Sequence, residues 1–417
     1  MIITAAEGYY IPSFYSINID SVRNIQECIK DNEQTFVHEY IHFLQDLSLP
    51  YSIRNTLVSN RYFLLAHQKI HEQGYLQRPA DIQDEDTLVT DKQFSFIWGG
   101  RDFIDDEIKI SSIGTEYFQM DLEDNKARIF KYTLQLENGV TYHFGARDLL
   151  EYIAHKIENK HWNTNAPAFP YKTVDMVFQA IGLGTVSDTV RVCFAEFCLY
   201  NDNPVHHFFR TIDDLQKAQL LDALLDYEAT KKVLSSMQWV AVGGFKETTE
   251  TKTARRLKDL KESLRQKYNT PNLPSVIEWI DDIVLFSEKE LASSFIFSEL
   301  FNMSEKDFFD KINFFIKEIG VPIVFNANDE YLSLLPEKYN QDEFFNIFIS
   351  LKFLTYIEQA ENKACPLFNF CKKNMSTDQI IMNQHCSNDP IKKLNEEYSC
   401  PFTIFLKLYG FDKIEWN

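Results

Sequence analysis

The spacing of apolar residues near the start of the chain predicts two consecutive helices. Apolar side chains recur three and four positions apart over residues 36–49 and again over residues 51–72. Thr35 suits the N-cap of the first helix, Pro50 interrupts the pattern, and Gly74 suits the end of the second helix. The first helix is apolar on most of its faces, which is typical of a buried central helix.

Shorter apolar runs predict strands. Residues 13–19 alternate with the period of a strand, and residues 94–144 hold short apolar runs broken by glycines and acidic residues. Within the second region, Asn138 and Gly139 separate two apolar runs. This dipeptide tolerates the positive φ angles of a type I′ turn, so a β-hairpin is predicted there. The polar and acidic residues 77–91 predict a surface loop.

From residue 146 onward the pattern is mainly helical. The predicted helices cover residues 146–160, 173–181, 186–200, 204–234, 249–268, 274–301, 304–319 and 341–360. Residues 323–326 form the one strand predicted after residue 170. We therefore predict an α+β protein in two parts: residues 1–210 contain a small mixed β-sheet, and residues 211–417 form a mainly α-helical C-terminal region.

The charge of the chain limits the partners that it can bind. Lys and Arg number 42 and Asp and Glu number 61, so the formal net charge is -19 in 417 residues. Such a charge disfavours binding to nucleic acid or to an anionic membrane. No run of about 18 apolar residues occurs, and the start of the chain lacks the basic and apolar segments of a secretory signal. We therefore expect a cytoplasmic protein that binds neither nucleic acid nor a membrane.

A candidate metal-binding motif lies inside the first predicted helix. The residues His38-Glu39-Tyr40-Ile41-His42 have the pattern H-E-x-x-H. Residues four apart project from the same face of a helix, so the two imidazoles can bind one Zn²⁺. Glu39 lies one position along, where its carboxylate can reach a metal-bound water rather than the metal. Because zinc lowers the pKa of such a water toward about 7, Glu39 is predicted to act as the general base.

Residues 36–45, FVHEYIHFLQ, resemble the active-site helix of zinc metallopeptidases of the zincin superfamily. The resemblance covers this one helix directly. It implies a zincin-like catalytic domain over residues 1–210. In the gluzincin branch of the superfamily, it also implies a third zinc ligand from a glutamate on a later helix, which leaves the fourth metal position for water.

Two glutamates are candidates for this third ligand. Glu151 is followed three residues later by alanine and seven residues later by Glu158, which is similar to the E-x-x-A segment that supplies the ligand in several gluzincins. Glu196, between Cys193 and Cys198 on an otherwise apolar helix, is the alternative. The resemblance favours Glu151.

Polar residues near the metal face are candidates for supporting roles. Gln45 and Asp46 lie close enough to this face to accept hydrogen bonds from the free N–H groups of the imidazoles, although Asp46 could equally be a solvated residue at the helix end. His155 lies one turn from Glu151. It is a candidate catalytic residue, either as a proton donor or as a hydrogen-bond donor to the transition state, against the alternative of a surface histidine.

Two further histidine pairs are not interpreted as metal sites. His67 and His71 are four residues apart but have polar neighbours and no acid between them, which is typical of an exposed helix face. His206 and His207 are adjacent, so their side chains point about 100° apart on a helix and cannot form a helical metal pair. One of the adjacent pair could still line a cleft.

Four of the seven cysteines, Cys365, Cys371, Cys386 and Cys400, cluster late in the chain. The odd total disfavours a complete disulfide framework. Four thiolates can bind a second, structural Zn²⁺, but none of the gaps between them is the two-to-four-residue spacing that makes such a site specific. A structural zinc, buried free thiols and an iron–sulfur cluster are therefore all open interpretations.

Together these features predict a zinc-dependent metallopeptidase that hydrolyses peptide bonds of a protein or peptide substrate. His38, His42 and Glu151 are expected to hold Zn²⁺, and Glu39 to act on its bound water. The resemblance implies that an extended substrate pairs with a sheet edge above the motif helix, and residues 94–144 are expected to supply that edge. The helical half is expected to gate the cleft, to select the substrate or to bind a regulatory protein partner.

Two alternatives use the same residues. In the first, the chain is a non-catalytic interaction protein whose zinc only stabilises the fold, with a closed coordination shell. In the second, the chain is a small-amide hydrolase, and its substrate enters a closed pit rather than a long groove. Metal coordination and pocket shape distinguish these alternatives from the metallopeptidase.

Overall fold

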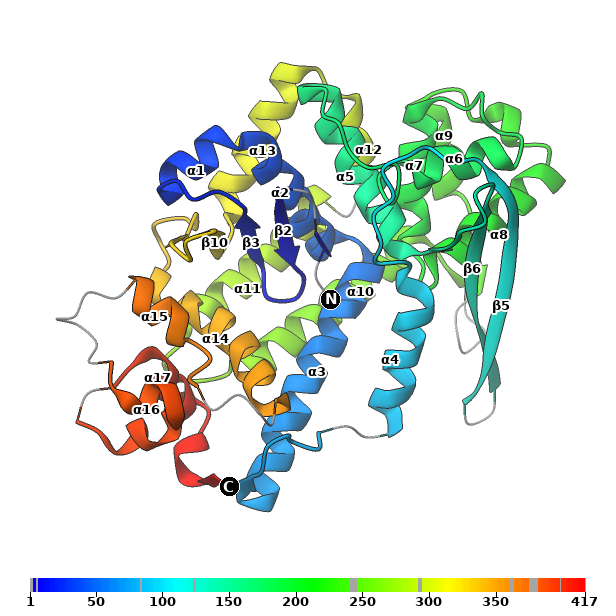
Figure 1. Ribbon diagram of the computed structural model, residues 1–417. Coiled ribbons are helices and arrows are strands. Elements are labelled where there is room, and N and C mark those ends of the chain that lie inside the picture. The colour runs from blue at the N-terminus through cyan, green and yellow to red at the C-terminus, as the bar shows by residue number, and fades with distance from the viewer. Residues whose placement is uncertain are drawn as a thin grey trace.

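The protein has an α+β fold of many helices and several small β-sheets (Figure 1). The computed structural model describes residues 3–4, 7–82, 85–122, 125–240, 246–291, 295–359, 364–374, 382–397 and 399–416. Within these ranges, no helix combines the length and the apolar character that a membrane span requires.

The α-helices run through the whole chain. Up to residue 217 they are α1 Ile25–Asp31, α2 Glu33–Ser48, α3 Pro50–Gln73, α4 Glu85–Trp98, α5 Ala146–Trp162, α6 Thr173–Ala180, α7 Asp188–Cys198 and α8 Pro204–Lys217. They continue as α9 Tyr227–Ser235, α10 Thr249–Lys267, α11 Pro274–Phe286, α12 Ile296–Asn302, α13 Glu305–Ile319, α14 Gln341–Glu358, α15 Phe368–Asn374, α16 Gln384–Asn388 and α17 Pro401–Leu408. Shorter helical turns are η1 Leu221–Ala223, η2 Ser287–Leu291, η3 Pro390–Asn395 and η4 Phe411–Lys413.

The strands form a five-stranded sheet, a three-stranded sheet and two short pairs. The five-stranded sheet contains, in spatial order, β1 Ile3–Thr4, β2 Gly8–Ile11, β3 Ser16–Ile19, β10 Ile323–Asn326 and β11 Tyr331–Leu332. The three-stranded sheet contains β5 Ile110–Leu122, β6 Asn125–Leu136 and β7 Thr141–Phe144. The short pairs are β4 Tyr75–Leu76 with β12 Glu415–Trp416, and β8 Trp239–Val240 with β9 Lys246–Glu247.

Helix α2 is a central element of the fold. Every residue from Thr35 to Ser48 is buried. The helix packs against strands β2 and β3 on one side and against helices α3 and α5 on others. Because neighbours cover it on several sides, its apolar residues are not confined to a single stripe.

Strand β2 approaches α2 closely at Gly8. A Cβ atom at this position would lie 2.7 Å from the backbone oxygen of Asn18, 2.8 Å from Cγ2 of Thr35 and 3.5 Å from Oε1 of Glu39. A larger residue would therefore push β2 away from its neighbours. Glycine allows this sheet to lie directly over the motif helix.

The three-stranded sheet does not lie over helix α2. Strands β5 and β6 form a long antiparallel hairpin that extends away from α2 on the far side of α4 (Figure 1). Their helix neighbours are α4, α6 and α8. The expectation that residues 94–144 supply the sheet above the motif helix is therefore wrong, because β2 and β3 of the five-stranded sheet take that place.

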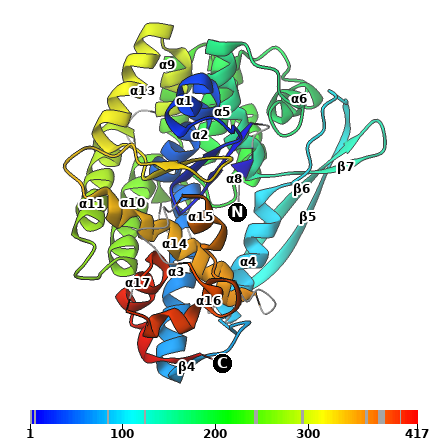
Figure 2. The same cartoon turned by 60° about the vertical axis from the view of Figure 1, so that its left-hand side comes forward.

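The five-stranded sheet joins the two halves of the chain. Strand β10 pairs in parallel with β3, with Val324 opposite Ile17. Helix α10 packs along α3 (Figures 1 and 2). Buried apolar residues from both sides of residue 210 belong to one contiguous core. The predicted division at residue 210 therefore separates parts that share a sheet and a core.

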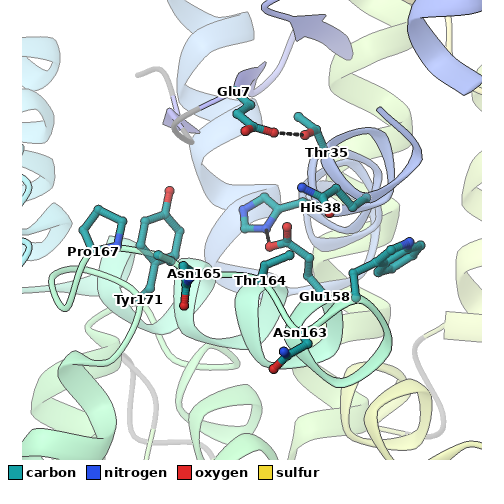
Figure 3. Close-up of a pocket in the computed structure, with 12 residues that line it drawn as sticks. Glu7, Thr35, His38, Glu158, Asn163, Thr164, Asn165, Pro167 and Tyr171 are labelled. Atoms are coloured by element: carbon teal, nitrogen blue, oxygen red, sulfur yellow. Dashed lines mark hydrogen bonds and ion pairs between the residues drawn. The ribbon is translucent and has the colours of Figure 1, made fainter. Parts of the chain in front are cut away.

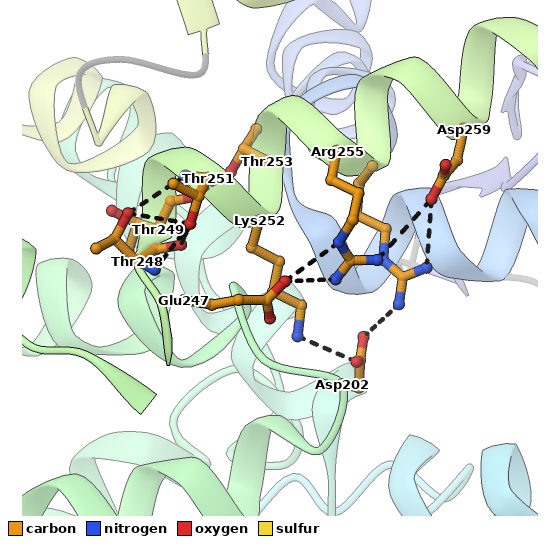
Figure 4. Close-up of polar contacts among 10 residues, drawn as sticks. Asp202, Glu247, Thr248, Thr249, Thr251, Lys252, Thr253, Arg255 and Asp259 are labelled. Carbon is orange, nitrogen blue, oxygen red and sulfur yellow. Dashed lines mark hydrogen bonds and ion pairs between the residues drawn. The ribbon is translucent and has the colours of Figure 1, made fainter. Parts of the chain in front are cut away.

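Polar contacts hold the start of α10 against the turn that follows α7 (Figure 4). Thr248 and Thr251 cap the helix: the backbone N–H of Thr251 donates to Oγ1 of Thr248, and the backbone N–H of Thr248 donates to Oγ1 of Thr251. The Asp202 carboxylate accepts from Lys252 Nζ at 3.0 Å and from Arg256 Nη2 at 3.1 Å. Since Lys252 is buried, its pairing with Asp202 fixes how α10 docks.

Most of the strongly periodic predictions are confirmed. The helices over residues 36–49 and 51–72 are α2 and α3, and α3 ends at Gly74 with a φ of 73°. Thr35 lies inside α2 rather than at its N-cap. The hairpin around Gly139 is confirmed as β6 and β7. Its turn is not type I′, because Gly139 has a positive φ and Asn138 does not.

Several other local predictions are wrong. The strand expected over residues 13–19 begins only at Ser16, because residues 12–15 form the turn between β2 and β3. The loop expected over residues 77–91 ends in the first turns of α4, whose later apolar residues pack against β6. The helix expected over residues 204–234 is broken into α8 and α9, and the helix expected over residues 274–301 is divided into α11, η2 and α12. After residue 170, where only residues 323–326 were predicted as a strand, β8, β9, β11 and β12 also occur.

Candidate metal centre

Helices α2 and α5 bring three predicted ligands together. His38 and His42 project from α2, and Glu151 faces them from α5. His38 Nε2 lies 3.2 Å from His42 Nε2 and 3.2 Å from Glu151 Oε2, and His42 Nε2 lies 3.4 Å from the same oxygen. All three side chains are buried, so one metal ion could contact all three ligand atoms. Among the described residues, no other group of at least three such side chains has ligand atoms within 4.8 Å of one another.

The remaining ring nitrogens are held by hydrogen bonds. His38 Nδ1 donates to Glu158 Oε2 at 2.9 Å, and His42 Nδ1 donates to Gln45 Oε1 at 2.8 Å. Gln45 Nε2 in turn donates to the carbonyl oxygen of Leu150 on α5 at 3.1 Å. These bonds turn the Nε2 atom of each ring toward the third ligand. Gln45 makes the predicted contact, whereas the sequence analysis did not assign this role to Glu158.

Asp46 does not contact either imidazole. Its Oδ2 atom accepts from the Tyr10 hydroxyl at 3.0 Å and from the Ser13 backbone N–H at 2.9 Å. Asp46 therefore ties α2 to the turn between β2 and β3. Of the two predicted orienting residues, only Gln45 reaches a ring nitrogen.

The histidine and glutamate side chains of the centre shift one another's pKa values. Burial lowers the pKa of His38, but the carboxylates of Glu158 and Glu151 raise it well above its ordinary value. Burial raises the pKa of Glu151, but hydrogen bonds to His38 and His42 lower it to about 2. Glu151 is therefore ionised at neutral pH, as a metal-binding carboxylate must be.

Three carboxyl groups, those of Glu39, Glu151 and Glu158, gather around the two imidazoles, and those of Glu39 and Glu151 are buried. The buried guanidinium of Arg147, whose Nε lies 4.0 Å from Glu151 Oε1, supplies one positive charge. The carboxylates raise the pKa of His38, and burial raises the pKa of Glu39, so both groups tend to keep a proton. A metal ion held by the two imidazoles would replace such a proton with its own positive charge.

Glu39 lies beside the ligands without a hydrogen-bond partner. Both of its carboxylate oxygens are buried and unpaired in the described structure. Burial raises the pKa of Glu39 well above its ordinary value, although His38 lowers it. Because an unpaired buried carboxylate is unfavourable, this residue indicates that the site is built for a polar occupant.

A cavity of about 320 Å³ lies against His38 and Glu158 (Figure 3). Tyr171 forms part of its wall, and the Tyr171 ring centroid lies 6.0 Å from that of His38. Glu7 and Asn163, also in the wall, are exposed, so the cavity opens at the protein surface. Sequence reasoning missed Tyr171, because it follows α5 in a connecting segment without any motif.

His155 lies near the centre but does not reach the ligand atoms. Its side chain is buried, and its Nδ1 lies 3.7 Å from Glu158 Oε2. Its ring packs against Tyr171 with the centroids 5.4 Å apart. His155 is therefore next to a residue that orients His38, and its catalytic role stays a prediction.

Glu196, the alternative third ligand, has a different partner. Its carboxylate accepts hydrogen bonds from the backbone N–H groups of Phe297 and Ser298 and from the Ser298 hydroxyl. These groups lie at the start of α12, so Glu196 satisfies donors that a helix leaves unpaired at its N-terminus. The structure thus brings Glu151, and not Glu196, to the two histidines.

The other histidine pairs have structural contacts. Nε2 of His67 and Nε2 of His71 lie 3.1 Å and 2.9 Å from the carbonyl oxygen of Tyr409, so this pair helps to dock the C-terminal segment on α3. His206 Nδ1 lies 2.9 Å from the Tyr132 hydroxyl. None of these residues lines the cavity beside His38.

Comparisons with known proteins give no indication of what the site does. No family model, no curated protein and no solved structure matches the chain. What stands is a buried group of two histidines and a glutamate that could bind a metal ion. Its position follows from the packing of α2 against α5.

Glu151→Gln should remove the bound metal, whereas Glu196→Gln should keep it. Both substitutions replace a buried carboxylate on a helix, but only the first removes a ligand charge. Metal content per chain, measured on purified proteins by mass spectrometry, checks this expectation. Equal metal content in the two variants would contradict the assignment of Glu151 as a ligand.

Gln45→Leu and Glu158→Gln should each weaken metal binding about 10–100-fold, because each removes a group that orients an imidazole. Asp46→Asn is the matched control, since Asp46 lies beside Gln45 but bonds to Tyr10 and Ser13 instead. Competition with a chelator of known affinity measures the effect. A loss in Asp46→Asn as large as in Gln45→Leu would show that general disturbance of α2 is responsible.

The stability contributed by Glu196 should fall as pH rises from about 4.5 to about 7. Burial raises the pKa of this carboxyl from 4.5 to about 7, so in this window the folded protein keeps a proton that the unfolded chain releases. Glu196→Gln cannot titrate and should lose less stability than the wild type over this range. Urea unfolding at several pH values tests this, and parallel stability profiles would refute it.

Proposed function

We propose that the protein is a zinc-dependent metallopeptidase. The observation that carries the proposal is the triangle of ligand atoms, with sides of 3.2, 3.2 and 3.4 Å. Zinc binds nitrogen and oxygen ligands at about 2.0–2.2 Å, so tetrahedral coordination separates such atoms by about 3.3–3.6 Å. Two imidazoles and one carboxylate also form the ligand type of a catalytic zinc site, which keeps a fourth position open.

Each residue of the centre has a role in this proposal. His38, His42 and Glu151 hold the metal, and Gln45 and Glu158 orient the rings. When bound, Zn²⁺ would supply Lewis acidity and a water of lowered pKa.

Glu39 supplies the acid–base chemistry. Its buried carboxylate takes the proton of the attacking water and returns it to the leaving amine. The absence of a hydrogen-bond partner for Glu39 in the described residues supports this role, because no other described group of the protein occupies its two oxygens. A pKa raised by burial strengthens the carboxylate as a base.

A peptide suits the surroundings of the centre. The cavity beside His38 opens at the surface, so an extended chain could enter while its ends stay in solvent. The five-stranded sheet also lies over α2 with β1 as an edge strand, and an extended peptide can pair with such an edge. Tyr171, beside His38 and buried, is placed to donate a hydrogen bond to a carbonyl oxygen of the substrate.

Glu39→Gln should retain the metal and slow peptide cleavage by at least about 10²–10⁴-fold, because the amide cannot accept the proton. The assay incubates the zinc-loaded full chain with a peptide library and detects new N-termini by mass spectrometry. Glu262→Gln, at an exposed position on α10, which carries no residue of the centre, is the control and should cleave like the wild type. Equal cleavage by Glu39→Gln and the wild type would end this mechanism.

The same experiment separates the two alternatives. A small-amide hydrolase would leave the peptides intact but hydrolyse acylated amines or formylated amino acids in a parallel assay, with the same dependence on Glu39. An interaction protein with structural zinc would keep its metal and cleave neither class of substrate. Either outcome would replace the peptidase proposal.

A further inference from the structure

The four late cysteines converge although they are far apart in sequence. Cys365 precedes α15, Cys371 lies in α15, Cys386 lies in α16, and Cys400 is the N-cap residue of α17. All four are buried and all four line the same small cavity, together with Leu367, Phe368, Met382 and Phe402. The cysteines outside this group, Cys28, Cys193 and Cys198, are buried elsewhere in the core.

We propose that Cys365, Cys371, Cys386 and Cys400 bind one structural Zn²⁺ that holds the segments from α15 to α17 together. This site is separate from the centre on α2 and does not depend on the proposed peptidase activity. It would take no part in catalysis, because four protein thiolates fill a tetrahedral shell and leave no open position.

The size of the cavity favours a single ion. Its volume is about 10 Å³, which is about the room that one water molecule needs. An iron–sulfur cluster with several metal atoms requires far more space between its cysteines. A zinc ion with Zn–S distances of about 2.3 Å requires only a space between four converging sulfur atoms.

Hydrogen-bond donors lie beside two of these sulfur atoms. The Thr403 hydroxyl lies 3.5 Å from Cys400 Sγ, and the backbone N–H of Leu367 lies near the sulfur of Cys365. Donors in such positions would stabilise a metal-bound thiolate.

A buried cation accompanies the cluster. Lys393, in η3, is 3 % exposed, and its ammonium lies near Cys386 and 3.3 Å from Glu396 Oε2. A zinc ion with four thiolates carries two excess negative charges. A buried ammonium beside the cysteines offsets part of that charge.

The helices around the cluster are short. Helices α15, α16 and α17 have seven, five and eight residues, and such short helices are not stable by themselves. The backbone N–H of Cys365 donates to the carbonyl oxygen of Cys386 at 2.7 Å, so two of the segments already touch at the cysteines. A shared metal would link them further.

Metal binding requires the thiols to move inward. No three of these sulfur atoms lie within 4.8 Å of one another, whereas tetrahedral Zn–S coordination separates sulfur atoms by about 3.8 Å. Rotation about the Cα–Cβ bonds can provide such a movement without a change of fold. On binding, each thiol loses its proton to solvent and its sulfur forms a bond to zinc, so no oxidant or reductant is needed.

The experiment uses the full chain with the His42→Ala substitution, which empties the centre on α2. This protein should still bind one zinc per chain, and the additional substitution Cys371→Ser should abolish that zinc. Cys28→Ser, at a buried thiol outside the cluster, is the matched control and should keep it. Replacing zinc with Co²⁺ should give an intense thiolate-to-cobalt absorption band in the control and not in Cys371→Ser.

A second measurement covers the case in which Cys371→Ser does not fold. Titration of the zinc-loaded wild-type chain with an organomercurial should release one zinc as the four clustered thiols react. Zinc content that is the same in folded Cys371→Ser and Cys28→Ser would overturn the proposal. Mercurial titration without zinc release, or an intact mass lower by the hydrogens lost in disulfide formation, would also overturn it.

Discussion

The contact between helices α2 and α5 is the constraint on which the candidate centre depends. Two histidines on one face of α2 provide half of a metal site, and only the packing of α5 against that face adds a carboxylate. The hydrogen bond from Gln45 to the Leu150 carbonyl joins the two helices at the same level. Gln45 also accepts a hydrogen bond from His42. One side chain therefore both links the two helices and orients a candidate metal ligand.

Burial makes this arrangement specific. Several ionisable side chains are removed from water between two helices and a sheet, and each would be unfavourable there without a partner. Most are paired with one another, whereas Glu39 is not. Strand β2 comes close to Glu39 at Gly8, which has no side chain to pair with the carboxylate.

The rest of the chain supports the sheet that covers the motif helix. Strand β10 belongs to the second half of the sequence, yet it pairs with β3 beside α2. Helix α10 packs along α3, and its buried Lys252 is paired with Asp202 beyond the end of α7. The first half is therefore assembled with, and not merely followed by, the helical region. The sequence pattern suggests two regions, residues 1–210 and 211–417, because strands are predicted mainly in the first. Such a pattern does not show that a strand of one region pairs with a strand of the other.

Residue patterns along the chain were sufficient to locate the helices that carry the candidate metal ligands. Helix α2 has a continuous apolar pattern, and the interval between His38 and His42 places both rings on one face by helix geometry alone. The selection of Glu151 over Glu196 came from a resemblance and not from physics. Both glutamates lie on apolar helices, and nothing local to either distinguishes a ligand from a residue that caps α12.

What the sequence determined by itself was local: the helical period, the shared face of the two histidines and the position of Glu39 beside them. Tertiary structure decided which distant side chains join them, because Glu151, Glu158 and Tyr171 approach only when α5 and the segment after it pack on α2. It also brought the late cysteines to one cavity despite gaps with no recognisable spacing. The physical reason is that backbone geometry sets relations within a helix, whereas relations between helices depend on the burial of surfaces from the whole chain.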